Sequence, residues 1–180
     1  MNSIITTETP TATPAIRRGA MHTLSILVNN EPGVLMRICQ VFSRRGFNID
    51  SLVVSEGRNA DFSRMTIGLS GDPKGLQQII MQVNKLIDVI HCAEHDATDA
   101  VVKELVLVKF LANDDQRTQA LQIIEHFDGK TVDLTPTSMI ALITGNSNEI
   151  DAAVTMLSKF QIIETVRTGK VVMATGEQPT

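Results

Sequence analysis

The chain contains no tryptophan, no tyrosine and two cysteines, and its aromatic content is 3%, all phenylalanine. The aromatic platforms on which single-stranded nucleic acid stacks are therefore largely missing. Its 16 basic and 20 acidic residues give a net charge of −4, so no positive field attracts nucleic acid or an anionic membrane. Cys39 and Cys92 are far apart in a chain long enough to build a core without cross-links, which argues against disulfides.

Long apolar runs and targeting signals are also missing. Runs such as 139–143 fall far short of the roughly 20 residues that a membrane helix needs. Residues 1–20 are rich in threonine, contain two prolines and have no signal-peptide core, so we expect a flexible extension, with Met21 as an alternative start. The sequence predicts a cytoplasmic protein without membrane contact. Its 43% hydrophobic content is typical of a globular fold.

From residue 22 the hydrophobic pattern becomes periodic. Apolar residues alternate over 24–28 as in a half-buried strand, and helical spacing follows from Val34 until Gly46 ends it. A hairpin, a second helix and a short strand come next, at 49–55, 63–69, 72–87 and 89–94. The order is βαββαβ.

The same order then recurs, with expected elements at 104–111, 114–126, 132–134, 139–144, 147–157 and 162–166. The sequence thus predicts an α+β fold of two ferredoxin-like βαββαβ units, at 21–95 and 103–173, with a linker at 96–102 and a tail at 174–180. Right-handed crossovers place both helices of a unit on one sheet face, so the other face is free to pair with something.

Signals of catalysis are mostly missing. Gly129 and Gly169, each followed by lysine, lack the upstream glycine of a phosphate-binding loop. The segment 68–71 is one residue short of a nucleophile elbow. His91 and Cys92 are neighbours on an expected strand, where their side chains point to opposite faces and cannot bind one metal ion. We therefore predict no catalytic and no metal-binding residues.

The turn over 29–35 is the most informative segment. A helix N-terminus carries partial positive charge, and Gly33 lets a ligand approach the backbone, which suits a carboxylate. We expect Asn48, at the start of the next strand, beside this turn, where its amide could bind an ammonium group. The alternative is simple capping, with Asn30 or Glu31 as the N-cap. Nearby apolar residues line either a small pocket or only the core: Val34, Leu35 and Ile49.

Several segments resemble one family, the small regulatory subunits of acetohydroxyacid synthase, also called acetolactate synthase. In the first unit, which resembles an ACT domain, they are HTLSILVNNEPGVLMR at 22–37, FSRRGFNIDSLVV at 42–54 and SRMTI at 63–67. In the second unit they are ELVLVK at 104–109 and IIETVRTG at 162–169. The resemblance covers about 21–173.

The resemblance implies a regulatory protein without chemistry of its own. It implies that the chain activates a catalytic subunit, which carries thiamine diphosphate, Mg and FAD, and that it confers feedback inhibition by valine, with leucine or isoleucine as possible effectors. It also implies a homodimer with the effector between one chain's first turn and its neighbour. The effector contacts that it implies are Asn30, Gly33 and Asn48, with Val34, Leu35 and Ile49 beside them.

Two other functions fit less well. A stand-alone amino-acid-sensing ACT protein acting on another target, such as a transcriptional regulator, would need a DNA-binding element, and no helix-turn-helix or basic stripe is evident. An acylphosphatase-like enzyme is suggested by Gly33, Val34 and Arg37, but the segment 29–32 puts an acid and a proline where a phosphate loop would be.

Overall fold

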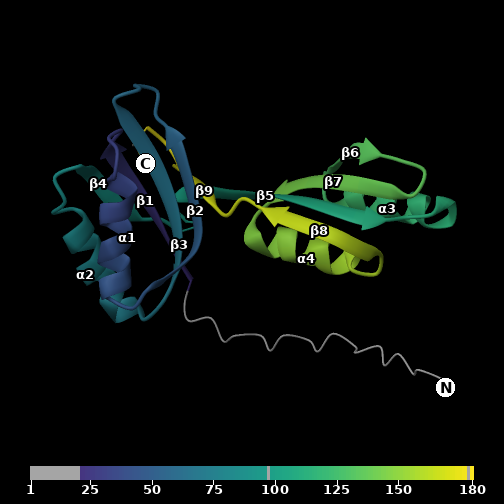
Figure 1. Cartoon of the computed structure of the whole chain (residues 1–180), viewed down its shortest axis with the longest axis horizontal. Helices are drawn as coiled ribbons and strands as arrows, with labels where there is room; N and C mark the ends of the chain where they lie inside the picture. The colour runs from purple at the N-terminus through teal and green to yellow at the C-terminus, as the bar shows by residue number, and fades with distance from the viewer. Residues whose placement is uncertain (1–20, 97, 178) are drawn as a thin grey trace, which may run out of the picture.

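The computed structural model describes residues 21–96, 98–177 and 179–180, which form two α+β units (Figure 1). The expected extension over 1–20 lies outside the described residues. The predicted order βαββαβ of the first unit is confirmed. Its elements are β1 (Met21–Asn29), α1 (Val34–Arg44), β2 (Asn48–Glu56), β3 (Phe62–Ser70), α2 (Pro73–Val83) and β4 (Val89–Glu94). They form an antiparallel sheet in the order β2-β3-β1-β4, with β2 at one edge.

The second unit repeats this order and adds a strand. Its elements are β5 (Ala100–Leu111), α3 (Asp114–His126), β6 (Lys130–Leu134), β7 (Ser138–Gly145), α4 (Ser147–Leu157), β8 (Gln161–Arg167) and β9 (Val171–Ala174). The sheet order is β6-β7-β5-β8, so the predicted fold class is confirmed. No helix in the described part of the chain is long and apolar enough to cross a membrane.

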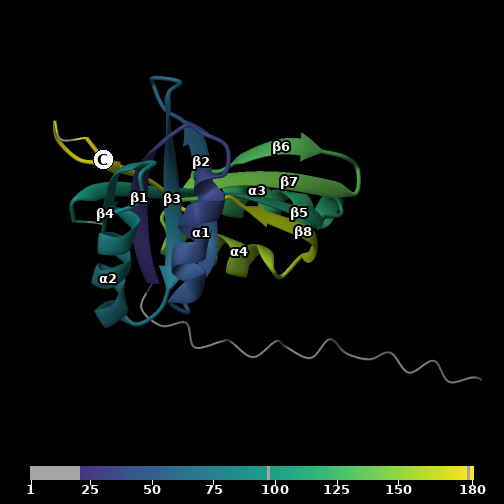
Figure 2. The same cartoon turned by 60° about the vertical axis from the view of Figure 1, so that its left-hand side comes forward.

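Each unit has its own core between its sheet and its two helices (Figures 1 and 2). In the first unit Leu24, Ile26 and Val28 alternate on the inner face of β1 and are fully buried, as are Ile38 and Phe42 of α1. This is the pattern that period-2 and helical spacing predict. The second core is built the same way from β5, β7, α3 and α4.

The connection between the units differs from the expected one. The predicted linker over 96–102 becomes part of β5 at Ala100, and the predicted tail over 174–180 begins at the last residue of β9. Residues 100–103 pair with 171–174 in an antiparallel ribbon. Local patterns could not predict this ribbon, because its two strands pair across about 70 positions of sequence and β9 has four residues.

The ribbon covers part of the helix-free face of the first sheet. Val53 and Thr66 from that face and Val172 from β9 line a common hollow of about 290 Å³. Arg64, on the same face, donates hydrogen bonds to Ser25 Oγ at 3.0 Å and to the backbone oxygen of Thr180. The face that the sequence left free is thus partly occupied by the chain's own C-terminal segment.

Candidate functional site

The turn between β1 and α1 is fastened to the β2–β3 hairpin. The Asn30 side chain donates from Nδ2 to the Ala60 carbonyl and accepts at Oδ1 from Ser63 Oγ, each at 3.0 Å. Its backbone amide donates to the Asp61 carbonyl at 2.8 Å. Asn30 therefore holds the turn in place. The capping alternative, with Asn30 or Glu31 as the N-cap of α1, is wrong, because the N-cap is Gly33 and no side chain caps the helix.

The N-terminus of α1 is open. Its N-cap is Gly33, with φ 85°, a left-handed conformation that favours glycine, and no side chain caps it. The other three helices in the described part of the chain have side-chain caps, from Asp72, Asn113 and Asn146 respectively. An uncapped helix start presents N–H groups and partial positive charge, which suits an anion such as a carboxylate.

The apolar residues beside this turn have different surroundings. Val34 is 3% exposed, and its side chain belongs to the core. Leu35 is 36% exposed and is free to present apolar surface next to Gly33. Arg37, one turn further along α1, forms an ion pair with Asp88, with Nε 2.7 Å from Oδ2.

Asn48 and Ile49 do not lie beside the turn in the same chain, so that expectation is wrong. Asn48 faces Ser70 across β2–β3, whereas Asn29, just before the turn, faces Phe62 across β1–β3. The two groups lie at opposite ends of the sheet, separated by eight residue steps or about 26 Å. Strand register, which depends on long-range pairing, decides this separation.

Asn48 starts β2 at an exposed position, and its Nδ2 donates to Asp50 Oδ1 at 2.7 Å. Ile49 packs partly against the core. Together with Phe47 and Ser43 they border a shallow hollow beside α1. One chain therefore holds two separate half-sites: the turn at Asn30 and this start of β2.

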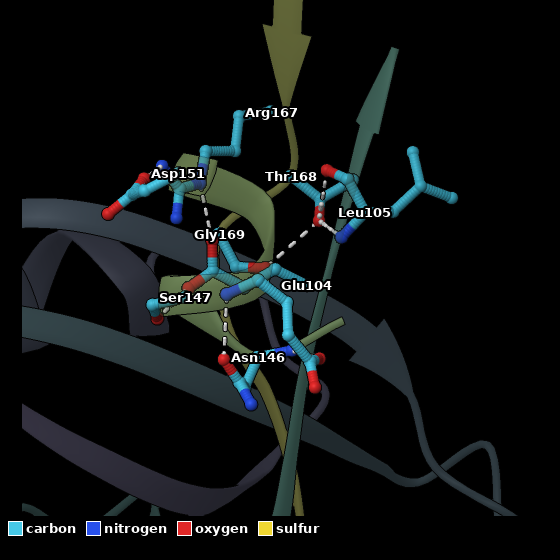
Figure 3. A network of polar contacts seen from close by, with 9 residues as sticks. Glu104, Leu105, Asn146, Ser147, Asp151, Arg167, Thr168 and Gly169 are labelled. Carbon is cyan, nitrogen blue, oxygen red and sulfur yellow. Dashed lines mark hydrogen bonds and ion pairs between the residues drawn. The ribbon is translucent and has the colours of Figure 1, made fainter. Parts of the chain in front are cut away.

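Sequence reasoning missed a polar cluster where β5, α4 and β8 meet (Figure 3). Glu104 is 4% exposed and accepts a hydrogen bond from Ser147 Oγ. It also forms an ion pair with Arg167, whose guanidinium donates a second hydrogen bond to Asp151 at 2.6 Å. Burial alone would lower the pKa of Arg167, but its hydrogen bonds to both carboxylates outweigh that and raise it. The sequence did contain a signal for this cluster. Glu104 stands two residues before Val106 on β5, so the alternation of the strand places its charged side chain on the buried face.

Neither a metal-binding cluster nor a nucleophile elbow is found among the described residues. They contain no group of three or more His, Cys, Asp or Glu placed to hold a metal ion. Burial raises the pKa of the Cys92 thiol to about 12, so it stays protonated and unreactive near neutral pH. Leu69 is buried in β3, and α2 begins only at Pro73, so the segment 68–71 forms no nucleophile elbow.

Comparison with known proteins agrees with this organisation. The family "AHAS small subunit-like ACT domain" matches residues 24–91, and the family "Small subunit of acetolactate synthase" matches residues 103–176. The acetolactate synthase small subunit of Mycobacterium bovis is 41% identical over 155 residues, covering 86% of this chain and 92% of the relative. A probable small subunit from Methanothermobacter thermautotrophicus is 40% identical over 158 residues, covering 87% and 94%.

The crystal structure of the acetolactate synthase small subunit from Thermotoga maritima has the same fold. It superposes with a TM-score of 0.79 at 34% identity, covering 88% of this chain and 99% of that one. The matches span both units and nearly the whole length of the relatives. The chain belongs to the family of acetolactate synthase small subunits, whose first unit is an ACT domain.

Proposed function

We propose that this chain is the regulatory subunit of an acetolactate synthase in the cytoplasm, which it activates and makes sensitive to valine. Its partner is the catalytic subunit, which holds thiamine diphosphate, Mg and FAD, while this chain holds no cofactor. The names of its relatives support such a partner, because a small subunit implies a second kind of subunit. The complex serves branched-chain amino-acid biosynthesis, and valine acts as the feedback signal.

The observation that carries the effector assignment is the uncapped start of α1. The valine carboxylate accepts hydrogen bonds from the N–H groups after Gly33, where a side chain would obstruct it. Leu35 supplies apolar contact for the isopropyl group. The second unit offers no comparable place, because Asn113 and Gln116 close the start of α3 with a capping box and Asp114 repels a carboxylate.

A second copy of the chain completes the site. Because β2 is an edge strand, two chains can pair their β2 strands antiparallel and extend the sheet to eight strands. Antiparallel pairing brings Asn48 of one chain beside the end of β2 in its neighbour. That end lies level with the Asn30 turn, because Glu56 faces Ser63 and Ser63 faces Val28. The side-chain oxygen of Asn48 thus accepts a hydrogen bond from the ammonium group of the valine at the neighbour's turn. By symmetry, a dimer holds two such sites.

This arrangement explains how a small ligand can regulate. Valine that contacts both chains favours the dimer arrangement in which its contacts are best, and its effect equals the difference in affinity between arrangements. A monomer has half of each site and cannot respond in this way.

The test is reconstitution with the catalytic subunit of the same organism. We expect the full chain to raise the rate of acetolactate formation from pyruvate, and valine to lower the rate of the complex but not of the catalytic subunit alone. Leucine and isoleucine are compared at the same concentrations. No binding between the two proteins would favour the stand-alone sensor, and hydrolysis of acyl phosphates would favour the acylphosphatase-like enzyme.

A further inference from the structure

Ser51 of β2 lies in a slot between two glycines from different units. Across the sheet it faces Gly68 of β3, and on its other side it meets Gly169, in the connection between β8 and β9. A Cβ atom at Gly68 would lie 2.5 Å from Ser51 Oγ, and one at Gly169 would lie 2.5 Å from Ser51 Cβ. Both glycines are buried. The slot therefore accepts the serine side chain and has no room for more.

On the side of the first unit, the slot is joined to the half-site at the start of β2. The register of β2 against β3 shifts between Ile49 and Ser51, which makes Asp50 the extra residue of a β-bulge. Asp50 Oδ1 accepts the hydrogen bond from Asn48, and in the described part of the chain its buried Oδ2 has no partner. If Asn48 moves when it binds an ammonium group, the movement is passed to Ser51 through one residue, Asp50 of the bulge.

On the side of the second unit, the slot is connected through Gly169 to the polar cluster where β5, α4 and β8 meet (Figure 3). Gly169 follows Thr168, whose Oγ1 accepts from the Leu105 amide at 3.2 Å, and Arg167, which holds Glu104 and Asp151. A displacement of Gly169 therefore moves groups that fix β5, β8 and α4 to one another. The bulge at Asp50 and the polar cluster around Arg167 border the same cavity of about 440 Å³. This cavity leaves space for such a displacement.

We propose that the Ser51 slot is the contact through which effector binding in the first unit reaches the second unit. The proposal rests on the proposed function, because it takes the start of β2 as half of the valine site. Valine favours one position of the bulge, Ser51 transfers this preference to Gly169, and the cluster around Arg167 changes the orientation of the second unit. Binding and response are then separable, since Ser51 and Gly169 contact no effector.

The experiment compares Gly169→Ala with Gly176→Ala in the full-length chain bound to the catalytic subunit. Both glycines have positive φ, 84° and 78°, but a Cβ at Gly176 meets nothing within 4 Å, so this control carries the backbone strain without the contact. We expect both variants to bind valine within about threefold of the wild-type affinity. Gly169→Ala should need at least about tenfold more valine for half-inhibition, and Gly176→Ala the wild-type amount.

A second variant tests the slot without overfilling it. Ser51→Gly empties the slot and should weaken inhibition in the same way while valine still binds, whereas Ser55→Gly on the same strand should not. Urea unfolding of every variant shows whether it is folded. If Gly169→Ala does not fold, Ser51→Gly still tests the proposal.

Three results would overturn the proposal, and they are distinguishable. If the wild-type complex responds to valine and both slot variants respond equally, the coupling role is wrong and the proposed function stands. If the slot variants fail to bind valine, Ser51 belongs to the effector site itself. If the wild-type complex ignores valine, the proposed function is wrong and the coupling falls with it.

Discussion

Replacing Asn30 with alanine should uncouple the complex from valine. The substitution removes two side-chain hydrogen bonds of 3.0 Å that hold the turn to the β2–β3 hairpin. Each is worth about 0.5–1.5 kcal/mol, and because Asn30 is exposed we expect a loss of about 1 kcal/mol in the free energy of unfolding. The larger effect is on valine binding, because the turn that carries Gly33 loses its fixed position.

We expect the valine concentration for half-inhibition to rise at least about tenfold, which corresponds to about 1.4 kcal/mol of coupling. Activation of the catalytic subunit should persist, because we expect the surface that contacts the partner to lie elsewhere. The assay is acetolactate formation by the reconstituted complex over a valine titration, together with calorimetric titration of the small subunit alone.

Asn84→Ala provides a matched control. The Asn84 side chain also makes two hydrogen bonds, donating to the Cys92 carbonyl at 3.0 Å and accepting from its amide at 2.8 Å, but it lies between α2 and β4. Asn84→Ala should destabilise the chain similarly and leave valine inhibition unchanged. If the Asn30→Ala complex were inhibited at the wild-type valine concentration, the turn would not be part of the effector site.

Three further outcomes are expected. A chain starting at Met21 should bind valine within about tenfold of the full chain, because the resemblance to the family begins at about Met21 and the threonine- and proline-rich composition of residues 1–20 predicts no contribution to the site; a greater loss in calorimetry would give the extension a role. Glu104→Gln should lower the free energy of unfolding in urea by about 1–2 kcal/mol, since it removes the charge that pairs with partly exposed Arg167; an unchanged midpoint would contradict this. Because burial raises the Cys92 pKa from 9.0 to about 12, the unfolded chain releases a proton above pH 9 that the folded chain keeps. Unfolding free energy should then fall by up to about 1.4 kcal/mol per pH unit above pH 9, and Cys92→Ala should lack this slope.

The sequence predicted those features that local periodicity determines. Leu24, Ile26 and Val28 alternate on β1, and Ile38 and Phe42 follow helical spacing on α1, so both elements and the face that each buries could be predicted. The α+β class followed from the order of such elements in two successive units. The start of α2 could be predicted for the same reason, because Asp72 before Pro73 forms a local start signal, but the helix expected over 72–87 ends at Val83.

Features that depend on long-range pairing could not be predicted. The position of Asn48 at the far end of the sheet follows from the register of β2 against β3. The strand β9 exists because it pairs with residues 100–103, and nothing near position 171 indicates that partner. The bulge at Asp50 likewise depends on the facing strand, since it is defined by which residues of β3 lie opposite Ile49 and Ser51.

The separation of the two half-sites leads to a final prediction about concentration. Asn30 and Asn48 lie about 26 Å apart in one chain, far beyond the length of a valine molecule, so one valine can contact both only in a dimer. Valine must then stabilise the dimer by mass action, by about 2.7 kcal/mol per site when its concentration is one hundred times its dissociation constant.

We therefore expect saturating valine to lower the dimer dissociation constant in sedimentation experiments by several orders of magnitude, given two sites per dimer. Conversely, the apparent affinity for valine should fall when the small subunit is diluted below its own dissociation constant, because binding must then also assemble the dimer. Asn48→Ala should reduce both effects without changing the open start of α1. A monomer that binds valine with full affinity would show that the turn alone forms the site, and the role of Asn48 would have to be abandoned.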